Sequence, residues 1–190
     1  MLQHIFSSFI YTDQLDLDNA ALEKVCYTHE KNNPTVYASN EGGWQSSSLN
    51  YKLEFTELFD AIQLRCNQLH LDLGFKEERS PQIGNFWINI NRESNSNNPH
   101  SHPGSFYSGT YYIKAAPRAG AISLMHPVDS YQYTVPYGLS DRSTSVSQHS
   151  WLEEPVAGKL IIFPSWLCHY VQPNRSGSDR ISIAFNVCLK

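Results

Sequence analysis

Three features that this 190-residue chain lacks already limit its function. Its net charge of −4 leaves no overall basic field that would attract nucleic acid or an anionic membrane surface. No apolar run approaches the roughly 18 residues that a membrane-spanning helix needs. The first residues lack the basic segment of a signal peptide, so we expect neither secretion nor a membrane anchor.

Paired cysteines are also absent. Cys26, Cys66, Cys168 and Cys188 are irregularly spaced and include no C-x-x-C pair. This pattern predicts buried or half-buried thiols in a reducing, cytoplasmic compartment rather than a disulfide framework. Cys168 directly precedes His169, but adjacent residues of a strand point to opposite faces, so we do not expect them to act together as a nucleophile and its base.

The sequence has no internal repeat and no linker-like segment, which favours one domain over residues 1–190. Helical periodicity occurs only in the first part, at Asp16–His29 and Phe55–Leu73. We therefore expect a helical support region over residues 1–80 and a β-rich core over residues 84–190. The predicted fold class is mainly β (α+β), an antiparallel sandwich or barrel with two helices packed on one side.

Short runs in which apolar and other residues alternate predict the strands of this core. The predicted strands are Leu2–Tyr11, Asn85–Asn91, Tyr107–Lys114, Ala121–Met125, Tyr131–Val135, Lys159–Phe163, Leu167–Val171 and Arg180–Val187. Their number and shortness are typical of an all-β sandwich or barrel.

Two connections could carry substrate recognition, because loops on a rigid scaffold often do. One contains Trp44, for which we favour a packing role over a place in the wall of a substrate cleft. The other is the long polar segment Asp129–Gln148. Of the remaining candidates, we expect Trp166 in the core and His70 at the surface or as a helix cap.

Residues with metal-binding and anion-binding chemistry gather in the C-terminal strands. His169 lies in one strand, and Arg180 and Ser182 project to the same side of a later one. A guanidinium binds a carboxylate through two parallel hydrogen bonds, and a serine hydroxyl adds a further donor. These residues could therefore hold a metal ion and an anion side by side.

A second candidate is the sequence His100-Ser101-His102. On an extended strand, residues i and i+2 face the same way, so the two imidazoles lie on one side. With a third histidine from a distant strand they would form a facial three-ligand site, which suits Fe, Zn, Cu or Ni and leaves positions open for substrate and O₂. An isolated H-x-H is a weak signal, and two exposed loop histidines are the alternative.

With these residues in view, the chain resembles the 2-oxoglutarate/Fe(II)-dependent oxygenases, and within them a group found in marine bacteria and cyanophages. The family pattern is H-x-D/E, a strand, H-x-V-x-P and then R-x-S in a later strand. The resemblance rests on HSHPGSFYSGTYYI (His100–Ile113), PVAGKLIIFPSWLCHYVQP (Pro155–Pro173) and RISIAFN (Arg180–Asn186). The segment Gly42–Ser46 also resembles the narrower group.

The resemblance implies a double-stranded β-helix, which is a jelly-roll or cupin-like barrel whose two sheets enclose a metal. It implies that His100 is the first metal ligand and His169 the distal one. Arg180 would bind the far carboxylate of 2-oxoglutarate, and Ser182 would assist it.

A tyrosine hydroxyl would contact the same carboxylate. Tyr112 lies where some members of the family place this tyrosine. The parity of its strand is open, so Tyr111 is the alternative.

At position 102 the chain departs from the family pattern, which has a carboxylate there. In the favoured interpretation His102 is the third ligand, with one negative charge fewer at the iron. In a second, His102 is the first ligand and Gly104 takes the carboxylate position, which leaves a coordination site for halide or water. In a third, the site has decayed or holds another metal.

The implied activity is that of an Fe(II)- and 2-oxoglutarate-dependent dioxygenase that hydroxylates its substrate and releases succinate and CO₂. O₂ is the co-reactant, and the substrate is an unidentified small molecule or protein. We expect no nucleic-acid or membrane partner, and a homodimer is a base-rate expectation. The rivals are a three-histidine cupin-type dioxygenase without 2-oxoglutarate and a non-enzymatic binding module on the same fold.

Overall fold

The computed structural model describes residues 7–49, 54–128 and 148–190. It contains two helices, α1 (Asn19–Asn32) and α2 (Thr56–Asp72). One group of strands consists of β1 (Tyr11–Gln14), β3 (Trp44–Gln45), β4 (Pro81–Asn91), β6 (Tyr107–Lys114), β9 (Lys159–Pro164) and β11 (Arg180–Leu189). The other consists of β2 (Asn40–Glu41), β5 (Ser96–His100), β7 (Ile122–Met125), β8 (Ser150–Glu153) and β10 (His169–Val171).

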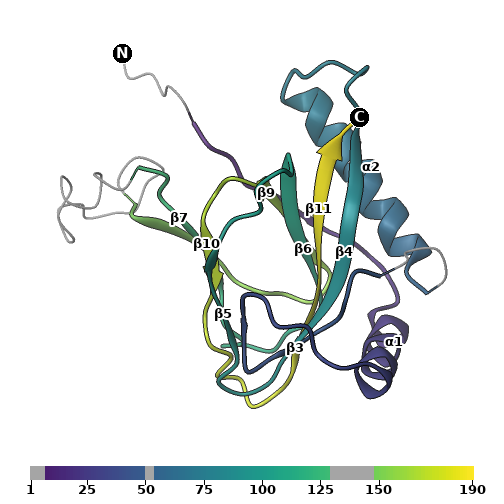
Figure 1. The fold of residues 1–190 in the computed structure, drawn as a ribbon, viewed down its shortest axis with the longest axis vertical. Helices are drawn as coiled ribbons and strands as arrows, with labels where there is room; N and C mark the ends of the chain where they lie inside the picture. Colours follow the sequence, from purple (N-terminus) through teal and green to yellow (C-terminus); the bar gives the residue numbers. More distant parts are fainter. Residues whose placement is uncertain (1–6, 50–53, 129–147) are drawn as a thin grey trace.

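These strands form two antiparallel sheets. The major sheet has the order β1-β9-β6-β11-β4-β3, and the minor sheet has the order β2-β5-β10-β7-β8. Both helices lie against the side of the major sheet that faces away from the minor sheet (Figure 1). The predicted mainly β architecture with two helices on one sheet is confirmed, and it has the layout of a double-stranded β-helix.

The two faces of the major sheet have different chemistry. In β11, Ile181 and Ile183 are fully buried in the core beneath the helices, whereas Arg180 and Ser182 line a cavity on the opposite face. We call these the helix face and the cavity face. Strands β4 and β6 pair with β11 over most of their length and repeat this division. The period of two therefore keeps the apolar core separate from the polar cavity within one sheet.

Both predicted helices are present with shifted ends. The first begins at Asn19 rather than Asp16, because the carboxylate of Asp18 accepts a hydrogen bond from the backbone N–H of Ala21 (2.9 Å) and caps the helix there. The second agrees with the prediction to within one residue at each end. No helix in the described ranges is long and apolar enough to cross a membrane.

The predicted strands agree well from residue 81 onward. Tyr107–Lys114 is found unchanged, and the strand predicted at Asn85–Asn91 extends back to Pro81 past a register shift opposite Asn186 and Val187. The predicted opening strand is wrong where it can be followed, since residues 7–10 are not extended in a sheet and β1 begins at Tyr11. Residues 1–6 and the predicted strand Tyr131–Val135 lie outside the described residues, as does the predicted connection except for Gln148.

Three further predictions concerned single aromatic rings. Trp44 packs in the core and its indole N–H donates to the carbonyl of Asn33 (3.1 Å), so the packing role is confirmed. Trp166 is 56% exposed in the turn after β9, so its predicted core position is wrong. His70 is buried, contrary to prediction, because the chain after α2 folds back and stacks Phe75 on its ring (5.1 Å between centroids).

The four cysteines are free thiols, as predicted. Cys26 and Cys66 are buried, and Cys168 and Cys188 are half-buried.

The close packing around β6 leaves no room for a side chain at Gly109. A Cβ at Gly109 would collide with the ring of Phe185 and the carbonyl oxygen of Ile161. We expect Gly109→Ala to lower the free energy of unfolding by about 2 kcal/mol or more, since the buried ring of Phe185 and the backbone at Ile161 must both move. Urea denaturation measures the loss. Gly84→Ala, whose Cβ would make only ordinary contacts, should change stability by less than about 0.5 kcal/mol, and equal losses in the two variants would contradict the steric argument.

Candidate metal centre

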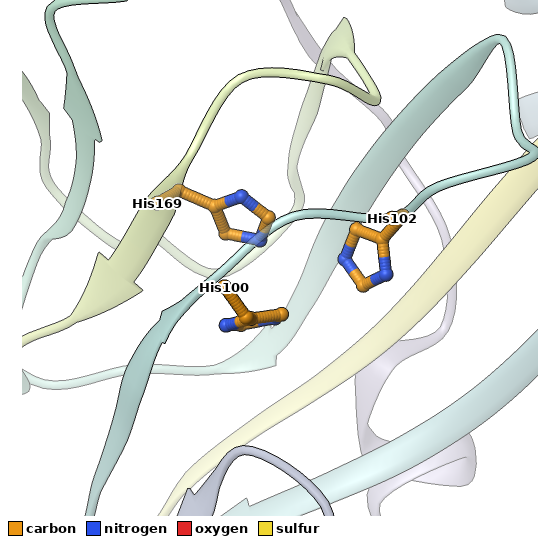
Figure 2. Close-up of side chains that lie close together, drawn as sticks. All are labelled: His100, His102 and His169. Carbon is orange, nitrogen blue, oxygen red and sulfur yellow. The ribbon is translucent and has the colours of Figure 1, made fainter.

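Three histidines converge between the two sheets. His169 begins β10, His100 ends β5 and pairs directly with it, and His102 follows in the turn after β5. Their nearest ring nitrogens all lie within 4.8 Å of one another. Figure 2 shows the three rings directed toward a common point, although they come from segments far apart in the sequence. The structure therefore brings together the three predicted ligand residues in an arrangement that could hold a metal ion.

Backbone carbonyls orient two of these rings. The Nδ1 atom of His100 donates to the carbonyl of Asn98 (2.7 Å), and Nδ1 of His169 donates to the carbonyl of Leu167 (2.9 Å). Because a carbonyl only accepts, Nδ1 carries the proton in both rings and Nε2 keeps its lone pair. This is the arrangement that metal-binding histidines ordinarily show.

The surroundings keep the three imidazoles neutral. Burial lowers the pKa of His169 to about 3 and the pKa of His102 to about 4, and the neighbouring His100 adds to both shifts. Burial also lowers the pKa of His100. A histidine binds a metal only in its neutral form. At neutral pH the cluster can therefore accept an ion without first losing protons.

Arg180 and the three histidines line one cavity, which we call the inner cavity. The Nη1 atom of Arg180 donates to three backbone carbonyls, those of Ala119, Gly120 (2.9 Å) and Gln172 (3.2 Å). Its Nη2 is buried and has no hydrogen-bond partner within the described ranges. Burial lowers the pKa of Arg180, but a guanidinium keeps its charge in proteins. A buried cation with an unused donor is the local chemistry of an anion site.

The two candidate tyrosines lie on opposite faces of β6. Tyr112 is on the cavity face of β6, whereas Tyr111 is on the helix face and its hydroxyl donates to Asn19 Oδ1 (2.7 Å). Burial raises the pKa of Tyr112 to about 12, although the nearby Arg180 acts in the opposite direction. The Tyr112 hydroxyl therefore stays protonated at neutral pH and can donate.

All the predicted site residues line the inner cavity: His100, His102, Tyr112, His169, Arg180 and Ser182. Sequence reasoning missed Trp87, Asn89 and Asn91, which line the same cavity from β4. The signal was available, since these three residues alternate with the apolar residues that face the helices.

A second, more open cavity adjoins the first and has a volume of about 520 Å³. We call it the outer cavity. It shares Trp87, His100 and His102 with the inner cavity, so it reaches two of the three histidines of the cluster. The loop of Trp44 contributes to its wall through Gln45 and the serines that follow, while the Trp44 ring itself is in the core.

Two antiparallel sheets that enclose three histidines and a buried arginine define a double-stranded β-helix with a possible metal centre. A model of the family described as "Putative 2OG-Fe(II) oxygenase" matches residues 85–186, which is more than half of the chain. The chain belongs to this family of oxygenases, whose cofactors are Fe(II) and 2-oxoglutarate.

Solved structures of low sequence identity share the fold. A prolyl-4-hydroxylase from Pseudomonas putida is 16% identical, with 94% of this chain and 91% of that one covered and a TM-score of 0.64. The epimerase SnoN from nogalamycin biosynthesis is 10% identical over 94% and 76% of the two chains, with a TM-score of 0.68. HygX from Streptomyces hygroscopicus, with nickel and 2-oxoglutarate bound, is 9% identical over 96% and 83%, with a TM-score of 0.59. No curated protein sequence matches significantly.

Gly120 is required for the position of Arg180. It has a φ of +90°, and a Cβ there would collide with the carbonyl of Gln172 and lie 2.8 Å from Arg180 Nη1. We expect Gly120→Ala to reduce the free energy of unfolding by about 2 kcal/mol more than Gly74→Ala. Gly74 also has a positive φ (+77°) but has open space around it, so it isolates the backbone term. Chemical denaturation of both variants makes the comparison, and equal losses would show that the Gln172 carbonyl and Arg180 can both move away at no cost.

Proposed function

We propose that the protein is an Fe(II)- and 2-oxoglutarate-dependent dioxygenase that hydroxylates its substrate. The observation that carries the proposal is the buried Nη2 of Arg180, which has no partner within the described ranges and lies in the same cavity as three neutral histidines. An enzyme of this class needs a metal and the dianion of 2-oxoglutarate side by side, and the cavity offers ligands for both.

The donor set fits the proposed ion. His100, His102 and His169 would hold Fe(II) through ring nitrogens, since imidazole is a good ligand for iron and three facial ligands leave positions open. Bound Fe(II) and 2-oxoglutarate supply the oxidising chemistry, in which 2-oxoglutarate and O₂ are consumed, succinate and CO₂ are released and a C–H bond of the substrate is hydroxylated.

The chain's own residues bind and orient the cosubstrate. Arg180 would use its free Nη2 on the far carboxylate, and the hydroxyls of Ser182 and Tyr112 would donate to the same group. The surrounding sheet excludes water from this carboxylate, which strengthens each charge-assisted hydrogen bond.

His102 as the third ligand agrees with its place in the cluster. The alternative register would have removed His100 from the metal and put Gly104 beside it. His100 pairs with His169 across the strands, and its Nδ1 is already bonded to a carbonyl in the manner of a ligand. Without 2-oxoglutarate, the buried Nη2 of Arg180 in the histidines' cavity would be left for the substrate itself, so 2-oxoglutarate binding through Arg180 separates the proposal from its rivals.

The metal prediction tests the three histidines. We expect His100→Ala, His102→Ala and His169→Ala each to weaken Fe(II) binding at least about 100-fold. Anaerobic equilibrium dialysis with Fe(II) measures the affinity. His29→Ala, which removes a histidine that pairs with Glu54 far from the cluster, should leave it unchanged. Full Fe(II) affinity in the His102 variant would remove that residue from the proposed ligand set.

The cosubstrate prediction tests Arg180. Titration of 2-oxoglutarate into the anaerobic Fe(II) protein should produce a saturable visible charge-transfer band. Arg180→Ala should weaken the binding of 2-oxoglutarate at least about 100-fold, because it removes a buried charged partner. Arg180→Lys should recover only part of the affinity, since it lacks the planar fork.

Arg175→Ala is the matched control, because it removes an exposed arginine outside the inner cavity and should leave the band unchanged. Tyr112→Phe gives a second variant, with a smaller loss, if the alanine at position 180 prevents folding. A normal band in both Arg180 variants would contradict the binding of 2-oxoglutarate by Arg180. A wild-type protein without any band would contradict the oxygenase function.

The narrower group with marine bacterial and cyanophage members, the cytoplasmic location, the single domain over residues 1–190 and the homodimer stay predictions. Hydroxylation is the proposed outcome within the oxygenase family.

A further inference from the structure

The outer cavity adjoins the inner cavity at His100 and His102 and is not lined by Arg180. It has a volume of about 520 Å³, which is within the range for small-molecule sites. Because Arg180 lines only the inner cavity and His100 and His102 line both, a substrate in the outer cavity would lie next to the metal without displacing the cosubstrate. The following inference rests on the proposed function, under which the outer cavity holds the substrate.

The wall of the outer cavity is uncharged and combines hydroxyl and amide side chains with apolar ones. Among its described lining residues there is no Asp, Glu, Lys or Arg. Its hydroxyl and amide side chains include Ser46, Ser47, Ser48, Asn85, Asn98 and Asn186. A charged substrate group would lose its hydration here without gaining an opposite charge, which is costly. Hydroxyls and amides both donate and accept, so they suit a neutral partner that does the same.

One of these amides is held in a defined orientation. Ser108 donates to Asn186 Oδ1 (2.7 Å), which leaves the Nδ2 hydrogens of Asn186 for the cavity. Asn85 lies directly opposite on the paired strand β4. Two amides therefore lie side by side in the cavity wall, and one of them has a fixed orientation.

An aromatic ring stands beside this pair. Trp87 follows Asn85 on the cavity face of β4, lines both cavities, and its ring centroid is 5.9 Å from that of His102. An indole offers a flat apolar surface at a small cost in conformational entropy. A group that stacks on Trp87 would therefore lie within reach of the metal ligands.

We propose that the outer cavity binds a neutral sugar unit of the substrate, with one face stacked on Trp87 and its hydroxyl groups bonded to the surrounding amides and serines. The polar groups come from three directions, namely the segment after β3, strand β5 and the β4–β11 pair. A ring with hydroxyls around its edge matches such an arrangement. An extended peptide presents its amides along a line and pairs with a strand edge instead.

The test uses the full-length protein loaded with Fe(II) and 2-oxoglutarate under anaerobic conditions. Isothermal titration compares methyl glycosides of neutral hexoses and neutral disaccharides with the matching uronic acids, amino sugars and a blocked neutral dipeptide. We expect the best neutral sugar to bind at least about tenfold more tightly than its charged analogues and the dipeptide. Tighter binding of a charged analogue or of the dipeptide, or no binding of any neutral sugar, would overturn the inference.

Two variants locate the binding. Trp87→Ala should weaken the binding of the best neutral sugar at least about tenfold. Trp166→Ala removes an exposed tryptophan outside the cavity and should leave the affinity for this sugar unchanged. Asn85→Asp should shift the preference toward the amino sugar, because it adds one negative charge to the wall. Unchanged sugar binding in Trp87→Ala would contradict the stacking.

The charge-transfer band separates this inference from the proposed function. A band with 2-oxoglutarate but no neutral-sugar binding contradicts the sugar inference alone. No band, together with sugar binding that depends on Trp87, contradicts the oxygenase function and supports the outer cavity as a sugar site. If the protein shows neither the band nor neutral-sugar binding, the oxygenase function and the sugar inference are both contradicted.

Discussion

The site depends above all on the long antiparallel pairing of β4 with β11. The pairing runs from Arg180 opposite Asn91 to Leu189 opposite Pro81, and its period of two gives each strand one apolar and one polar face. Each large apolar side chain buried under the helices contributes roughly 1.5–3 kcal/mol. This burial stabilises the strands well enough that their other face can carry polar groups, among them the buried Nη2 of Arg180, which has no hydrogen-bond partner within the described residues. Alternate residues of the same two strands therefore serve different purposes: those on one face stabilise the fold, and those on the other face form the site.

The burial of Arg180 on the polar face carries a large cost in desolvation free energy. A buried guanidinium loses its hydration, and the three carbonyls around Nη1 replace only part of it. These carbonyls come from the turn before β7 and from Gln172, which follows β10, the strand that carries His169. The arginine thus ties the start of β11 in the major sheet to two strands of the minor sheet.

The sequence predicted those parts of the site that follow from the period of two. It placed Arg180 with Ser182 correctly, because residues two apart in a strand share a face. It could not choose between Tyr111 and Tyr112, since β6 is buried on both faces and only the neighbouring helix identifies the outer one. Trp87 was missed although it alternates with the apolar residues of β4, because alternation shows which face a residue is on but not that this face lines a cavity.

The histidine at position 102 changes the charge balance of the proposed site. Three neutral imidazoles leave the two positive charges of Fe(II) uncompensated, whereas the carboxylate of the family pattern would neutralise one. At 4 Å and an effective dielectric constant of 20, one such pair of unit charges is worth about 4 kcal/mol. The dianion of 2-oxoglutarate would have to supply this compensation, to the metal and to Arg180 together. Metal and cosubstrate would then strengthen each other's binding by the same factor, because coupling between two binding events is reciprocal.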